Sequence, residues 1–280
     1  MAEQNKGMSD LWRRLRFVFM AIVIYRLGTH IPIPGIDPAR LAALFDQNQG
    51  TILEMFNLFS GGALERMSIF ALNVVPYISS AIIMQLFSNS IPYLQDLKKD
   101  GQAGRNQITQ FTRYGTVILA FVQASALAVT LGASGLAYEP GTSFFISAVF
   151  SVVAGTIFLM WLGEQISERG IGNGISIIIA TSILTGIPGA IGQALEQARQ
   201  GDLNILLLLG IGVLAMLVIA IVVFIERGQR RITVNYAQRQ QGRKLMQAQA
   251  SHLPFKVNMA GVIPAIFAST FLLFPASLST

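Results

Sequence analysis

Cysteine is absent from this 280-residue chain, so it can form neither a disulfide nor a thiolate metal site. Histidine occurs only twice, at His30 and His252, which lie far apart in the sequence near the ends of expected membrane spans. We interpret both as surface or interfacial residues. The HExxH and GxSxG patterns of hydrolases are also missing from the apolar segments. The sequence therefore predicts no cofactor, no metal and no enzymatic activity.

Charged residues are scarce as well, at 12% of the chain, while hydrophobic residues make up 52%. A soluble domain carries about 25% charged residues, so this composition indicates an integral membrane protein. The apolar runs are near-continuous and lack the alternation of a membrane barrel. We therefore predict an all-α, polytopic helical bundle. The expected spans cover residues 17–33, an interrupted segment within 57–94, 114–131, 144–162, 175–191, 205–225 and 257–274.

The second of these segments is unusual because it is interrupted. Gly61 and Gly62 open it, Glu65 and Arg66 charge it, and Pro76 divides it. The pieces on either side of Pro76 would each be about 20 Å long as helices, whereas the hydrocarbon core is about 30 Å thick. A broken helix survives at membrane depth only where protein or a water-filled cavity covers its freed backbone groups. We expect this segment to line a cavity; the alternative is one helix kinked at the proline.

The distribution of lysine and arginine predicts the orientation. With the N-terminus in the cytoplasm and seven spans, only Arg26, Arg40, Arg66 and Arg199 fall outside, and the other cations fall inside. This bias predicts a cytoplasmic N-terminus. Arg26 lies within the first span, and we expect its side chain to snorkel toward the nearer surface.

Two matching segments suggest an internal repeat. Pro76 follows Val74-Val75, and Pro264 follows Val262-Ile263, each in the middle of an apolar stretch. Five spans separate the two, so the second unit would be inverted, as in many transport proteins; chance similarity is the alternative. We predict a first five-span half at 1–195 and the start of a second half at 196–280, with its remaining spans beyond this sequence.

The expected spans from 114 onward have no charged residue in their apolar middles, which argues against proton relays and favours a passive pore. The long loop at 226–256 is strongly basic, which suits phosphate groups or anionic lipids. The alternative reading of this loop is a determinant of membrane topology without a partner. The rival functions are a small-solute secondary transporter, and a lipid scramblase or intramembrane enzyme. The transporter would need a polar binding site at the ends of the broken helix, and the sequence has no cluster of acids or amides there. The scramblase or intramembrane enzyme lacks a candidate catalytic group in this sequence.

Several long motifs are distributed along the whole chain. They are IPIPGID (31–37), FSGGAL (59–64), SIFAL (68–72), PYIS (76–79), GRNQITQFTRYGT (104–116), MWLGEQISERGIGNGISIII (160–179), ERGQRRI (226–232) and VNMAGVIPAIFAS (257–269). Together these motifs resemble the SecY family of protein-conducting channels. The resemblance implies a ten-span bundle in the bacterial plasma membrane, of which this chain carries the first seven spans. It also implies translocation of unfolded secretory polypeptides and insertion of hydrophobic segments into the membrane.

The resemblance further implies roles for individual residues. A plug at 61–73, formed by a short half-helix, would close the outer funnel through Gly61, Gly62, Ala63, Leu64, Glu65, Arg66, Ser68, Ile69 and Phe70. The matching positions of an aliphatic pore ring are Val74, Ile78, Ile175, Ile179 and Ile266. Val74 departs from the isoleucine usual in the family, which removes one methylene from the seal.

Partners are implied in the same way. The SecA ATPase and the translating ribosome would dock on cytoplasmic loops through Lys98, Lys99, Arg105, Arg227, Arg230, Arg231, Arg239, Arg243 and Lys244. The SecE and SecG subunits, a signal-bearing polypeptide and membrane lipids would complete the set. The second, third and seventh spans would form most of a lateral gate toward lipid.

Overall fold

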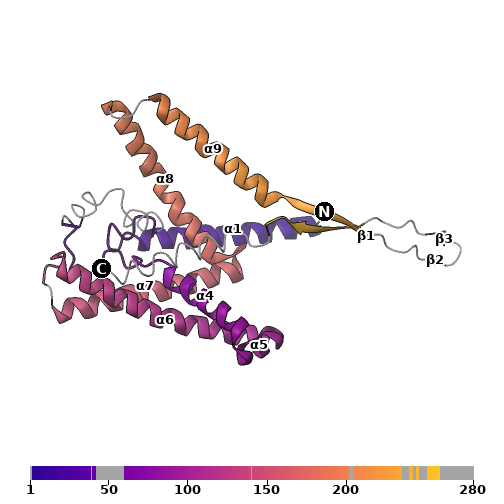
Figure 1. Ribbon diagram of the computed structural model, residues 1–280, viewed down its shortest axis with the longest axis horizontal. Helices are drawn as coiled ribbons and strands as arrows, with labels where there is room; N and C mark the ends of the chain where they lie inside the picture. The colour runs from indigo at the N-terminus through magenta and orange to yellow at the C-terminus, as the bar shows by residue number, and fades with distance from the viewer. Residues whose placement is uncertain are drawn as a thin grey trace. The chain divides into compact units, whose positions relative to one another are not determined.

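The computed structural model describes residues 2–38, 40–41, 60–139, 141–201, 205–234, 240–241, 244–245 and 251–258. These residues fall into two compact units, one that extends to Ile191 and one that begins at Gly192. Helices dominate both units (Figure 1). They are α1 (Ala2–Gly28), α4 (Val75–Ser90), α5 (Pro92–Lys99), α6 (Gly101–Ala133), α7 (Thr142–Arg169), α8 (Gly174–Gln200) and α9 (Ile205–Arg227).

By length and composition, four helices of the described part can cross a membrane: α6, α7, α8 and, from Leu206, α9. Helix α1 overlaps the first expected span but carries a polar, charged N-terminal half. Helix α4 has 16 residues, fewer than the roughly 20 needed to span the hydrocarbon core. The expected span at 257–274 lies almost entirely outside the described residues. The prediction of a mostly helical membrane protein with several apolar spans is confirmed.

Helix α4 begins where Pro76 interrupts the apolar segment. It starts at Val75, so the proline occupies the first turn, where its missing N–H leaves no intrahelical bond unmade. Residues 61–74 before it form turns instead of a helix. The alternative of one helix kinked at Pro76 is therefore wrong, and so is the expectation of a short half-helix over 61–73.

The polar stretch at 95–113 is helical, although we expected a loop there. It contains the end of α5 and the first turns of α6, which is 33 residues long. Leu94 and Leu97 of α5 are buried, and Lys98 and Lys99 are exposed. The short helix thus packs one apolar face against its neighbours α4 and α6.

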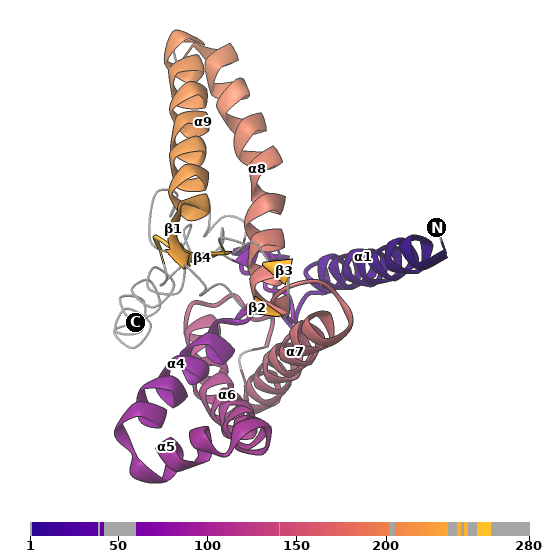
Figure 2. The same ribbon diagram turned by 90° about the vertical axis from the view of Figure 1, so that its right-hand side faces the viewer.

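A row of small side chains allows close packing along α6. Thr112, Thr116, Ala120, Ala124 and Ala128 recur at every fourth position and are all buried. Residues four apart share one helix face, and small residues there let neighbouring backbones approach closely. Helices α6 and α7 lie side by side (Figures 1 and 2), α4 packs on α6, and α1 packs on α7.

Glycines make two further close approaches possible on α7. A Cβ atom on Gly155 would overlap the carbonyl oxygen of Ile69, and a Cβ atom on Gly174 would overlap that of Gly163. The first approach places residues 69–70 directly against α7. The second sets the tight connection between α7 and α8.

The second unit contains α9 and a β-ribbon that the sequence did not lead us to expect. Strands β1 (Gln229–Val234) and β4 (Ser251–Lys256) pair antiparallel, with Ile232 opposite Leu253. Two shorter strands, β2 (Gln240–Gln241) and β3 (Lys244–Leu245), also pair. The basic segment at 226–256, expected to be a loop, is therefore partly an extended ribbon.

The Gly155 contact gives a test of this packing. The Gly155→Ala substitution should destabilise the protein by about 1–3 kcal/mol, because the new methyl group forces α7 away from the Ile69 carbonyl. Thermal unfolding of the purified protein should show a lower midpoint. Gly132→Ala on α6 is the matched control, since a Cβ atom there meets nothing within 4 Å. Equal midpoints for both variants would contradict the proposed close approach.

Candidate functional site

Residues 60–74, which we call the plug segment, lie in the interior of the first unit without regular helix. Gly61 and Gly62 adopt positive φ angles of 67° and 79°, and Met67 and Asn73 adopt 40° and 49°. The left-handed conformation is open to glycine and tolerated by asparagine, whereas it is uncommon for methionine. Four left-handed residues in one segment break any continuous α-helix.

A backbone pairing with the IPIPGID segment explains why a helix does not form. The amide of Ile33 donates to the carbonyl of Met67 at 2.8 Å, and the amide of Ile69 donates to the carbonyl of Ile31 at 3.0 Å. Pro32 and Ser68 thereby form an isolated bridge. Groups that would otherwise continue a helix are used between two chain segments, so the plug segment keeps its hydrogen bonds without one.

The side chains of the predicted plug divide into a buried and an exposed set. Ala63 and Ser68 are fully buried, and Phe70 is 3% exposed, whereas Glu65 and Arg66 are exposed. The Phe70 ring stacks between Tyr25 of α1 and Phe158 of α7, with ring centroids 6.0 and 5.9 Å apart. Gly28 leaves the space that this ring fills. Intermediate burial is found for Gly62, Leu64 and Ile69, while Gly61 is buried.

Four of the five predicted ring residues lie in one apolar cluster of the first unit. Val74 is buried, and Ile78 of α4 with Ile175 and Ile179 of α8 are half-buried against the same core. Phe70 of the plug segment belongs to this core too. Ile266, the fifth predicted member, lies outside the described residues. The role of these residues as a pore ring stays a prediction.

A buried polar cluster adjoins this core, and no pattern in the sequence indicated it. The hydroxyl groups of Tyr25 and Ser182 are 2.6 Å apart, and Asn73 Nδ2 donates to Ser182 Oγ at 3.1 Å. The Tyr25 hydroxyl also donates to the carbonyl of Ser60 at 3.3 Å. The three side chains come from α1, the plug segment and α8. Their wide separation in the chain hides the cluster from any local sequence pattern.

Cationic groups meet the plug segment near the end of α1. Arg26 is half-buried and donates to the carbonyl of Gly61 at 3.2 Å, so it contacts the plug segment. Its snorkelling toward the nearer surface stays a prediction. Arg66 donates to His30 Nε2 at 3.3 Å, and His30 Nδ1 donates to the carbonyl of Arg26 at 2.8 Å. This geometry assigns the proton of a neutral His30 to Nδ1.

The predicted docking cations are exposed wherever the structure describes their side chains. Lys98 and Lys99 lie on α5, where Lys98 bonds to Asn89 and Lys99 to Asp96. The remaining exposed members are Arg105 on α6, Arg227 on α9, and Arg230 and Arg231 on β1. Lys244 lies on β3. Arg239 and Arg243 lie outside the described residues.

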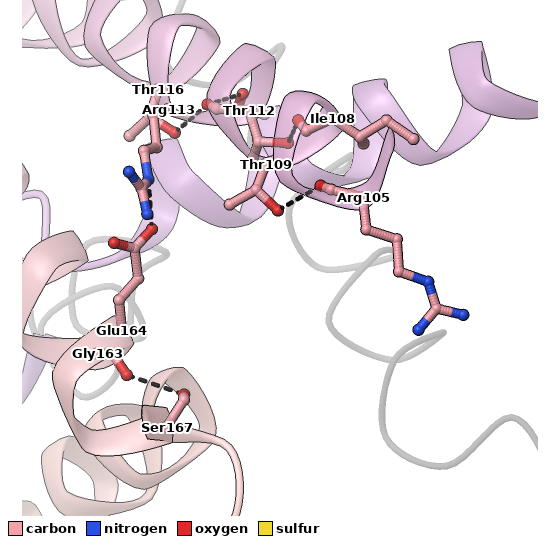
Figure 3. A network of polar contacts seen from close by, with 10 residues as sticks. Arg105, Ile108, Thr109, Thr112, Arg113, Thr116, Gly163, Glu164 and Ser167 are labelled. Carbon is pink, nitrogen blue, oxygen red and sulfur yellow. Dashed lines mark hydrogen bonds and ion pairs between the residues drawn. The ribbon is translucent and has the colours of Figure 1, made fainter. Parts of the chain in front are cut away.

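An ion pair joins α6 to α7 within the first unit. Arg113 Nε contacts Glu164 Oε1 at 2.8 Å, and the side chain of Glu164 is only 19% exposed (Figure 3). On α6, the hydroxyl groups of Thr109, Thr112 and Thr116 each donate to the carbonyl four residues earlier. These bonds keep the threonine hydroxyls paired within the helix, so the ion pair is the polar link between α6 and α7 shown in Figure 3.

At the N-terminal end of α1, the hydrogen bond from Arg14 holds the pKa of Asp10 below its usual value, although desolvation opposes it. Asp10 also pairs with Arg13 at 2.7 Å.

Among the described residues, no group of three or more His, Asp or Glu side chains could hold a metal ion.

Comparison with known proteins agrees with the resemblance seen in the motifs. The family model described as SecY matches residues 68–280. The protein translocase subunit SecY of Pseudomonas aeruginosa is 64% identical over 279 residues, which cover 100% of this chain and 63% of that protein. The Escherichia coli K12 subunit of the same name is 58% identical over 278 residues, which cover 98% of this chain and 63% of the relative. The chain thus spans less than two thirds of the length of these relatives.

Solved structures share the fold at lower sequence identity. A structure of a protein conducting channel matches with a TM-score of 0.64 and 22% identity, over 93% of this chain and 56% of that one. A structure that concerns the plug domain of SecY matches with a TM-score of 0.65 and 22% identity, over 96% and 57%. These likenesses support the arrangement of helices in the described units.

The Arg113–Glu164 pair can be tested by a double-mutant cycle. Arg113→Gln and Glu164→Gln should each lower the unfolding midpoint. The double variant should lose less than the sum, with a coupling of up to about 1 kcal/mol for a pair that is partly exposed. The coupling should shrink in high salt because screening weakens the attraction. Strict additivity at low salt would show that the pair does not link α6 to α7.

Proposed function

The chain belongs to the SecY family, and on this basis we propose that it forms the central part of a protein-conducting channel. The channel moves unfolded secretory polypeptides across the bacterial plasma membrane and releases hydrophobic segments into the lipid. The family is not enzymatic, and its members are multi-pass proteins of bacterial membranes. We also propose, from the excess of cations in the expected cytoplasmic segments, that the N-terminus lies in the cytoplasm.

The observation that carries this proposal is the contact between the plug segment and the aliphatic cluster. Val74, Ile78, Ile175 and Ile179 pack with Phe70 in one apolar core, and the plug segment ends directly at Val74. Ile175 and Ile179 are four residues apart on α8 and share one face of that helix. Val74 directly precedes α4, and its carbonyl accepts a hydrogen bond from the amide of Ile78 at 3.0 Å. In the proposed channel these aliphatic groups and Ile266 surround the narrowest part of the path, and a further ring member belongs to a span that this sequence does not include.

Aliphatic side chains suit this role for a physical reason. They offer no hydrogen bond that would favour one substrate sequence over another, so they can close around any extended chain. Ions lose hydration without compensation when they pass such a constriction, and narrow apolar constrictions also gate by dewetting. The ring therefore excludes ions while a polypeptide moves. Val74 is one methylene shorter than isoleucine and loosens the seal slightly.

The driving force and the entry of substrate depend on partners. The proposed partners are SecE and SecG, the SecA ATPase and the translating ribosome, whose RNA phosphates would contact the exposed basic side chains of α5, α6 and β1. Canine Sec61, which has a similar fold, is described in a ribosome-channel complex. A hydrophobic signal segment would part the second and seventh spans and leave sideways into lipid.

The seal can be tested by making the ring polar. Ile78→Ser and Ile179→Ser should each raise the resting ion conductance of the reconstituted channel severalfold, because a hydroxyl group lowers the barrier to a hydrated ion. Planar bilayer recording measures this directly. Ile118→Ser on α6, where the side chain is 65% exposed, is the matched control and should leave conductance unchanged. Unchanged conductance in the Ile78 and Ile179 variants would count against the ring.

Translocation itself is tested with a stalled secretory chain. A photoreactive residue at position 78 should crosslink to a stalled substrate, whereas the same residue at position 118 should not. A small-solute transporter or a lipid scramblase would give no such crosslink. This result would therefore decide between the channel and its rivals.

The docking surface gives another prediction. Arg230→Glu together with Arg231→Glu should weaken ribosome binding and reduce the salt dependence of log Kd, by about 1.5 in slope if both arginines contact phosphates. Arg199→Glu, exposed at the end of α8 on the side expected to face outward, is the control. Equal binding by the double variant and the control would refute a role for β1 in docking.

A further inference from the structure

We propose that Tyr25, Asn73 and Ser182 form a latch that holds the plug segment closed and opens when the aliphatic ring is spread. This inference rests on the proposed channel function. It assigns to three side chains the coupling between widening of the pore and release of the plug segment.

The hydrogen bonds of the latch meet at one oxygen atom. Ser182 Oγ accepts a bond from Asn73 Nδ2 at 3.1 Å, and it lies 2.6 Å from the Tyr25 hydroxyl and 2.9 Å from the carbonyl oxygen of Ile178. Two proton arrangements satisfy both hydroxyl groups. Either Ser182 donates to Ile178 and accepts from Tyr25, or Ser182 donates to Tyr25, which then donates to the carbonyl of Ser60. Each hydroxyl thus always has an acceptor.

The side chains of the latch are buried, which raises the free-energy cost of breaking their hydrogen bonds. Tyr25 is 1% exposed, Ser182 is fully buried, and Asn73 is 4% exposed. Polar groups in such a setting are costly to leave unpaired, because no water replaces the lost partner. The three side chains therefore hold together as a unit, and they separate only if water or a substrate enters.

The latch contacts both ends of the plug segment. Ser60 begins the segment and is bonded to Tyr25 through its carbonyl, while Asn73, one residue before the end of the segment, is bonded to Ser182. Gly61 also lies against α8, since a Cβ atom there would be 3.0 Å from the carbonyl oxygen of Ser182 and 3.0 Å from Thr185 Oγ1. The plug segment is thus a loop whose two ends are fastened at one place, between α1 and α8.

One face of α8 carries one residue of the latch, Ser182, and two residues of the predicted ring. Ile175, Ile179 and Ser182 are spaced at i, i+4 and i+7 on α8, which places them along one side of the helix. On the other side of the contact, Asn73 immediately precedes Val74. An outward movement of α8 that separates Ile175 and Ile179 from Val74 and Ile78 also pulls Ser182 away from Asn73. Widening of the ring and release of the plug segment are therefore one event.

The first experiment removes single groups of the latch. Tyr25→Phe deletes one hydroxyl and keeps the ring that stacks on Phe70, and Asn73→Gly deletes the amide while it still permits the positive φ angle. Each variant of the complete channel, reconstituted in vesicles, should leak ions about fivefold more at rest, the shift in open population that loss of one hydrogen bond produces. Ser182→Ala already removes the bonds to Tyr25 and Asn73, so adding Tyr25→Phe removes only the bond to the Ser60 carbonyl. The double variant should therefore leak less than the product of the two separate fold-changes predicts.

A matched control separates the latch from ordinary packing. Ser80→Ala also removes a buried serine hydroxyl, one that donates to the carbonyl of Thr112 at 2.7 Å between α4 and α6. It should lower the unfolding midpoint about as much as Ser182→Ala but leave the resting leak unchanged. If Ser80→Ala leaks as much as Ser182→Ala, or if neither leaks, the latch is overturned and the cluster is only structural.

The second experiment locks the latch instead of breaking it. These 280 residues contain no cysteine, so Asn73→Cys with Ser182→Cys provides the single thiol pair within them. Bridging the pair with a short, reducible bifunctional reagent should block translocation, and reduction should restore it. Each single cysteine variant treated with the same reagent should translocate normally. Undiminished translocation through the bridged channel would refute the coupling.

Different outcomes would refute the channel function and the latch. If the unaltered channel does not translocate a secretory chain, the proposed function itself is wrong. If it translocates normally while Tyr25→Phe and Asn73→Gly leak no more than Ser80→Ala, the channel stands and the latch alone is wrong.

Discussion

Residues 60–74 are governed by one constraint: backbone hydrogen bonds must be satisfied where neither helix nor water can supply them. The pairing of Ile31 and Ile33 with Ile69 and Met67 meets that constraint across two chain segments. It fixes where the segment lies, which side chains point inward, and where Pro76 can begin α4. The pairing is a single bridge made of two backbone hydrogen bonds, so it holds the segment in place without making it part of a helix. Such a segment can leave its site without unfolding the helices around it.

Close helix contacts supply the rigid frame around this segment. The small side chains along α6 and the glycines at 155 and 174 bring backbones together at positions where any larger residue would collide. In lipid, such packing replaces the hydrophobic drive that assembles a soluble core. The helices are therefore tightly packed where small residues lie between them. They are more loosely packed where half-buried isoleucines contact the plug segment. A channel needs both properties in one unit.

The sequence predicted what depends on composition and local pattern. Apolar runs predicted the helices, Pro76 predicted the break before α4, and long motifs predicted the family. It did not predict the turns of the plug segment, because their cause is a partner strand some 35 residues away in the chain. The Tyr25–Ser182 contact could not be predicted for the same reason. A serine in an apolar span has the same sequence context whether its hydroxyl bonds to its own helix or to another one. The β-ribbon was missed because its alternation is short and its cross-strand pairing is not local.

The juxtaposition of an aliphatic ring and a buried polar cluster follows from what each can do. A ring of isoleucines seals against ions but has no directional contact, so by itself it cannot hold a plug in one place. Hydrogen bonds are directional and short-ranged, so they hold the segment firmly over a fraction of an ångström and release it fully once the partners part. Both kinds of contact involve the same face of α8, and each has a different role. In the proposed latch, the apolar contact yields gradually to a passing chain, and the polar contact converts that gradual movement into an abrupt release.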